Sequence, residues 1–116
     1  MRTSILTATV LVGAFATAAM AHHGWGSYDA ARKFTIQSPV KHLQWQNPHV
    51  HIHLEHENAT WTIVLAPISR MERRGLAPDT IKAGIEVAAE GYPSKREEHE
   101  MRAERIKVGA TTYELR

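Results

Sequence analysis

Apolar and polar residues alternate strictly along residues 49–54. Successive side chains of a β-strand point to opposite faces of a sheet, so this alternation predicts a strand over residues 49–56 with one apolar and one histidine face. The apolar face consists of Val50, Ile52 and Leu54, and the histidine face consists of His49, His51 and His53. We expect the apolar face to lie in a core and the histidine face to meet solvent or a cleft.

Five further segments have strand patterns bounded by turn residues. They cover residues 33–46, 60–66, 85–92, 101–108 and 111–115. Pro39 lies inside the first of these segments and marks a bend, a bulge or an edge, because proline has no N–H to donate to a ladder. The apolar register changes after Pro39, and a bulge near Lys41 and His42 accounts for that change.

A short helix is predicted over residues 69–74. Ser69 and Glu72 have the spacing of a capping box, and Gly75 is placed to end the helix. Three strands, a helix and two or three more strands follow the order of an oligonucleotide/oligosaccharide-binding (OB) barrel. A small β-sandwich is the alternative, and the helix between the third and fourth strands favours the OB order. We therefore predict an all-β fold with one short helix: a small OB-like β-barrel of five to six strands.

The first 21 residues have the pattern of a secretory signal peptide. Arg2 precedes an apolar run over residues 5–19, and Ala19, Met20 and Ala21 match an A-x-A cleavage site. The run is short for a membrane span, so we expect no stable span after cleavage. The predicted organisation is a signal peptide over residues 1–21, an N-terminal arm over 22–32 and the barrel domain over 33–116. The mature protein is therefore expected in the periplasm or outside the cell.

Charge and cysteine content exclude several kinds of partner and site. The formal net charge is +2, and loss of Arg2 with the signal peptide leaves +1, which gives little attraction for nucleic-acid phosphates. The chain has no cysteine, so disulfides and thiolate metal sites are excluded. No Ser-His-Asp order, P-loop or dinucleotide-binding glycine pattern is present, and a small barrel has little room for a buried substrate pocket. We therefore expect a protein that is not an enzyme.

Several short blocks resemble a family of small exported bacterial proteins that is catalogued as a domain of unknown function. The blocks are HHGW (22–25), WQNPH (45–49), RRGL (73–76), EGYP (90–93) and TYELR (112–116). The resemblance covers nearly the whole mature chain. It implies an exported, OB-like single domain and implies no established activity.

The histidine strand suggests a metal ion as ligand. A His-x-His pair on a strand places two imidazoles on one side, and imidazole suits copper, zinc and nickel. His49 with His51, or His51 with His53, can act as a chelate. All three on one ion is harder, because a strand holds the outer pair about 13 Å apart at Cα. The alternative is that these histidines only occupy a solvated face.

The mature amino terminus is the second candidate for metal binding. After cleavage at Ala21, the free amine and imidazole of His22 can chelate one ion, and a histidine from elsewhere completes a three-nitrogen histidine brace. Copper(II) favours such ligation, and the amine must first lose its proton. His23 can contribute its imidazole instead. The alternative is a floppy two-histidine tail, while His42 and His56 are expected to be bystanders.

These patterns together predict an exported metal-binding protein with metal sites at His22, His23, His49, His51 and His53. Copper is the expected ion, with zinc or nickel as alternatives, and the expected role is copper buffering, delivery or tolerance. The alternative function is a non-metal interaction module that holds a protein partner or an envelope component on the barrel face. Arg70, Arg73 and Arg74 form a local basic patch that we interpret as a solvated helix face.

Overall fold

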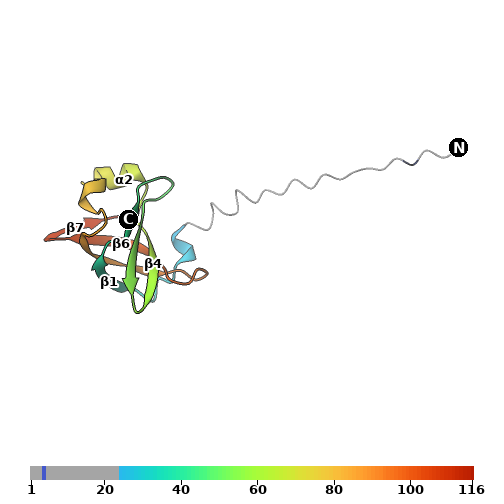
Figure 1. Cartoon of the computed structure of the whole chain (residues 1–116). Helices are drawn as coiled ribbons and strands as arrows, with labels where there is room; N and C mark the ends of the chain where they lie inside the picture. Colours follow the sequence, from blue (N-terminus) through green and yellow to red (C-terminus); the bar gives the residue numbers. More distant parts are fainter. Residues whose placement is uncertain (1–3, 5–23) are drawn as a thin grey trace.

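Seven strands and one short α-helix make up the part of the chain that the computed structural model describes, which is Ser4 and residues 24–116 (Figure 1). The elements are η1 (Trp25–Ser27), β1 (Phe34–Pro39), β2 (His42–Gln44), β3 (His51–His56), β4 (Ala59–Val64), α2 (Ile68–Arg73), η2 (Pro78–Thr80), β5 (Glu86–Pro93), β6 (Glu100–Val108) and β7 (Thr111–Glu114). All but one residue of the predicted signal peptide, together with His22 and His23, lies outside the described residues. Each predicted strand has its counterpart, and the first is divided in two.

The strands form one mixed sheet in the order β1-β5-β6-β4-β3-β2, with β7 added to β6. Every pairing is antiparallel except that of β4 with β6. The fold is therefore mostly β with one short helix, as expected. The strand ladders do not close the sheet into a barrel, because β1 and β2 stand at its two ends.

The division between β1 and β2 falls where the sequence places its break. Val40 N–H donates to the Ile85 carbonyl at 2.8 Å, whereas Lys41 N–H donates to the His53 carbonyl at 2.9 Å. Two successive residues thus donate to opposite sides of the sheet, one next to β5 and the other in β3. The strand bends just after Pro39, the residue that has no N–H to donate.

Helix α2 begins earlier than the capping-box pattern predicts. Its first residue is Ile68, after Pro67, and the Ile68 N–H donates to the side-chain oxygen of Asn47 at 3.1 Å. The prediction of Ser69 as N-cap was wrong, because a side chain from the loop before β3 satisfies the helix start instead. The helix end is as predicted: Gly75 has a φ of +91°, in the left-handed region that favours glycine.

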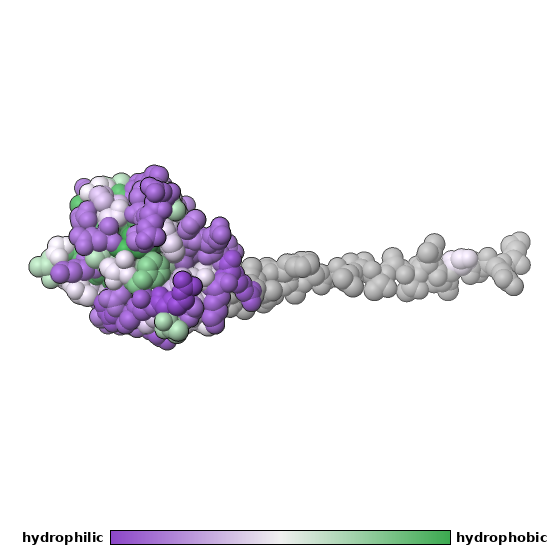
Figure 2. All heavy atoms as spheres, turned by 90° about the horizontal axis from the view of Figure 1, so that it is seen from below, coloured by the Kyte–Doolittle hydropathy of each residue, from purple (hydrophilic) through white to green (hydrophobic). Residues whose placement is uncertain are grey.

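The core lies on the apolar face of β3 and the elements that pack against it. Val50, Ile52 and Leu54 are fully buried, and His51 and His53 are half-buried on the opposite face. The pleating expected for this strand is confirmed. Figure 2 shows the outcome at the surface, where mostly hydrophilic residues surround a small apolar area on the underside.

The N-terminal arm is docked by its aromatic residues. Tyr28 is buried, and its hydroxyl donates to Glu100 Oε2 at 2.9 Å. Trp25 meets Tyr92 edge to face, with ring centroids 6.1 Å apart. The arm residues from Trp25 onward therefore belong to the folded unit.

Candidate functional site

A pair of histidines lies on the outer face of β2 and β3. The antiparallel register of these strands sets His42 opposite His53. Their rings are stacked, with centroids 5.5 Å apart and planes inclined by 14°. We call these two residues the histidine pair. His42, expected to be a bystander, is thus the histidine whose ring stacks on that of His53.

The environment of His53 favours the neutral imidazole. Partial burial, followed by the charges of His42 and Lys41, lowers the pKa of His53 below its ordinary value. A neutral imidazole is the form that binds a metal ion. His53 therefore stays available as a ligand at a lower pH than a free histidine would.

A carboxylate beside the histidine pair is already engaged. Lys41 Nζ lies 2.6 Å from Glu55 Oε1, and the Thr60 hydroxyl donates to the same oxygen at 2.6 Å. The hydrogen bond from Lys41 is the main cause that lowers the pKa of Glu55. Glu55 is consequently held as an ionised partner of Lys41.

The predicted histidine set is only partly brought together in the described structure. His51 lies two residues before His53 on β3 and opposite Gln44 of β2, while His49 precedes the strand. Within residues 24–116, no three histidine or carboxylate side chains gather closely enough to hold a metal ion. His22 and His23 lie outside the described residues. The strand spacing of about 7 Å between alternate residues keeps these imidazoles apart along β3.

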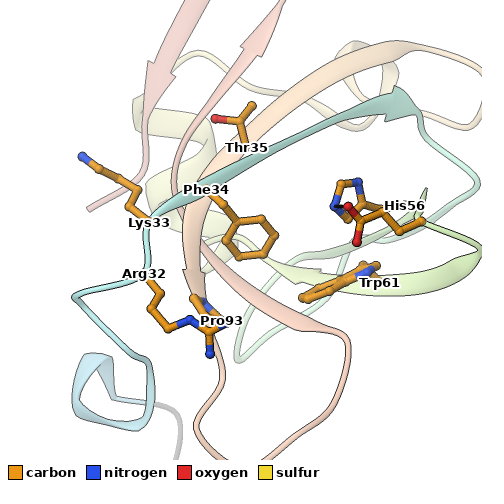
Figure 3. Close-up of a pocket in the computed structure, with 8 residues that line it drawn as sticks. Arg32, Lys33, Phe34, Thr35, His56, Trp61 and Pro93 are labelled. Atoms are coloured by element: carbon orange, nitrogen blue, oxygen red, sulfur yellow. Dashed lines mark ion pairs between the residues drawn. The ribbon is translucent and has the colours of Figure 1, made fainter.

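A second feature is an aromatic pocket of about 570 Å³ at the end of the sheet where β3 turns into β4 (Figure 3). Its lining residues are Arg32, Lys33, Phe34, Thr35, His56, Glu57, Trp61 and Pro93. Trp61 meets Phe34 edge to face at 5.3 Å and His56 at 6.0 Å between ring centroids. Figure 3 shows these three rings turned toward one another, with Arg32 near Pro93 and the Lys33 side chain pointing away from the rings.

The aromatic pocket was not predicted from the sequence. His56 follows the parity of the apolar face of β3, so its ring points to the side opposite that of His53. Phe34 and Trp61 come from β1 and β4, which are not neighbours in the sheet. Only the tertiary fold brings them together, and the sequence signal available was one aromatic residue near the end of each strand.

The fold and these features define a small, mostly-β domain with a histidine pair on one sheet face and an aromatic pocket at the sheet end. The chain belongs to a family of unknown function, DUF6152, whose sequence model matches residues 10–102. This match confirms that the chain belongs to a family of unknown function, and the matched residues include four of the five blocks and end before the TYELR block. A comparison with curated proteins finds no match.

Within the described residues, the single α-helix is too short and too polar to cross a bilayer, and no other helix there meets the requirement.

Proposed function

We propose that this protein is exported and binds a transition-metal ion at the histidine pair, copper first and zinc or nickel second. The observation that carries the proposal is the cross-strand stacking of His42 and His53. Adjacent strands hold facing side chains about 4.5–5.5 Å apart at Cβ, so small rotations bring two imidazoles onto one ion. Both strands are fixed by the sheet, which keeps the two ligands in place before the ion arrives.

The histidine pair supplies two nitrogen ligands, and copper(II) takes more than two. His51 on the same strand face, His49 just before the strand and the mature amino terminus at His22 and His23 are the proposed further ligands. Copper(II) stands highest in the affinity order for divalent ions and accepts imidazole and amine nitrogens. The proposed role of the protein is copper buffering, delivery or tolerance in the periplasm.

The proposed scaffold for this site is an OB-like barrel whose first strand is bent. In this view β1 and β2 are two halves of one strand, and they join the two ends of the sheet through Val40 and Lys41. The strand order, the parallel pair β4–β6 and the position of α2 between β4 and β5 all support the OB order.

The test is a calorimetric titration of the mature protein, starting at His22, with copper(II) at pH 7. We expect the His42→Ala/His53→Ala variant to lose at least about tenfold in affinity, or about 1.4 kcal/mol. The control is His99→Asn, which removes an imidazole outside the histidine pair. His99 has a φ of +55°, and asparagine tolerates that backbone conformation. Equal copper affinity in the mature protein, the double alanine variant and the His99→Asn control would contradict the proposal.

A second version of the protein tests the arm. One additional residue before His22 removes the free amine from that histidine and changes no residue of the folded domain. If copper binding weakens in this version as well, the amine and the histidine pair act together. If only the double alanine variant weakens, the site consists of strand residues alone.

The aromatic pocket favours a second candidate function, a non-metal binding module for a partner or envelope component. Its three facing rings suit a planar apolar group, and Arg32 beside them suits an acidic substituent, whereas the Lys33 ammonium is paired with Glu90 and Glu104. Indole-3-acetate is a suitable probe for this combination. We expect the binding signal of indole-3-acetate in ligand-observed NMR to be lost with the Trp61→Leu variant. The signal is expected to be kept with the control Trp45→Leu, since Trp45 does not line the pocket. Equal signals in both variants would remove the pocket as the binding site.

A further inference from the structure

Four arginines surround a second pocket, of about 360 Å³, beside α2. They are Arg70, Arg73, Arg74 and Arg116, and we call this the arginine pocket. Three of them come from α2 and its end, and the fourth follows β7. The pattern in the helix alone suggested a solvated face, but the fold adds a guanidinium from the far end of the described chain.

Two of these guanidinium groups are held by the backbone that follows β7. Arg70 donates to the Leu115 carbonyl at 3.3 Å, and Arg74 donates to the Arg116 carbonyl at 3.4 Å. Leu115 is fully buried, and its N–H donates to the Glu104 carbonyl at 2.9 Å. The Leu115 acceptor is thus fixed to the core, so Arg70 is oriented before any ligand binds.

The fourth guanidinium is held by an aromatic ring and a carboxylate. Arg116 lies over the Trp25 ring, 4.4 Å from its centroid, and its Nη1 is 3.7 Å from Glu104 Oε1. A cation over an indole face is attracted by the ring quadrupole. Because arginine side chains lose much rotamer entropy when they bind a ligand, this prior ordering lowers the cost of binding.

The arginine pocket has an excess of positive charge. Among residues 24–116, no Asp or Glu side chain lines it. The nearby Arg102 responds to this field: burial is the main cause that lowers its pKa, and the charges of Arg70 and Arg116 lower it further. Glu104 offsets part of the charge of Arg116, but the cations around this small space still repel each other, and a bound anion relieves that repulsion.

We propose that the arginine pocket binds a multiply charged oxyanion of the phosphate class. The guanidinium fork matches phosphate oxygens with two parallel hydrogen bonds. Several guanidinium groups around one pocket suit an anion with more than one charge better than a single carboxylate. The shared chemistry has two possible sources in an exported protein, a soluble phosphate compound or the headgroup of an anionic lipid. This proposal is independent of the metal site, since it uses none of the same residues.

The test is a calorimetric titration of the mature protein with pyrophosphate. We expect binding that weakens with added salt, because partly exposed charges are screened, and a loss of at least tenfold in affinity in Arg73→Gln/Arg74→Gln. Arg73 and Arg74 are exposed at the end of α2, so the variant is expected to stay folded. Circular dichroism checks this expectation. The charge-matched control is Lys82→Gln/Lys107→Gln, at exposed positions outside the pocket. The absence of binding, or equal loss in both variants, overturns the proposal.

Vesicles distinguish the two sources of the oxyanion. The same proteins are sedimented with phosphatidylcholine vesicles, with and without phosphatidylglycerol. One outcome is binding to the anionic vesicles that pyrophosphate competes away and that the Arg73→Gln/Arg74→Gln variant (the α2 variant) loses. This outcome assigns the arginine pocket to a lipid headgroup. Pyrophosphate binding without vesicle binding assigns it to a soluble phosphate compound. Vesicle binding that pyrophosphate does not compete away and that the α2 variant retains contradicts the proposed site.

Discussion

Replacing Gly91 by alanine will lower the free energy of unfolding by at least about 3 kcal/mol, near the upper end of what overpacking costs. Gly91 lies in β5 opposite Ala103 of β6, where the register of the two strands shifts. An ideal Cβ at this position would stand 2.7 Å from the carbonyl carbon of Arg102 and 2.8 Å from the Cα of Ala103. These are backbone atoms of the adjacent strand, so no side-chain rotation relieves the clash. Urea unfolding followed by circular dichroism measures the loss.

The control for this prediction is Gly26→Ala. A Cβ at Gly26 meets no heavy atom within 4 Å. Its unfolding midpoint is therefore expected to stay close to that of the parent protein. Similar losses in the two variants would mean that the close approach of β5 and β6 at Gly91 does not control stability.

Truncating Ile52 to alanine will lower the free energy of unfolding by about 2–5 kcal/mol. Ile52 is fully buried in β3, paired with Leu43 on one side and Ile63 on the other. Removing its outer carbons loses apolar burial and leaves a cavity that the paired strands cannot easily fill. Thermal or urea unfolding measures this loss.

The adjacent residue on the same strand gives the sharpest comparison. His53→Ala is expected to cost no more than about 1 kcal/mol, because the ring is half-buried on the outer face. A large loss at His53 with a small loss at Ile52 would contradict the pleating of β3. The expected result would also show that the His53 ring can be removed for metal titrations without unfolding the protein.

The proposed metal site and the proposed oxyanion site lie on separate parts of the molecule. The histidine pair lies on β2 and β3, and the arginine pocket lies between α2 and the residues after β7. Their variants share no residue, so the failure of one titration leaves the other informative. A protein with both sites would hold a metal ion and an anionic group on two separate surfaces.

Several features were predictable from local sequence because one physical rule sufficed for each. Strict alternation fixed the buried and exposed sides of β3, since successive side chains of a strand point in opposite directions. Pro39 marked the bend because it cannot donate to a ladder. Gly75 marked the end of α2 because the residue at that position has a positive φ, a conformation that favours glycine.

The sequence alone determined the family, the mostly-β class, the strand segments and the faces of β3. Only the tertiary structure decided that His42 stacks on His53, that Asn47 rather than Ser69 satisfies the start of α2, and that Arg116 completes the arginine pocket. The reason is the range of the interactions. Pleating, helix ends and turns depend on residues within a few positions of one another, whereas strand register and the meeting of distant segments depend on how the whole core packs.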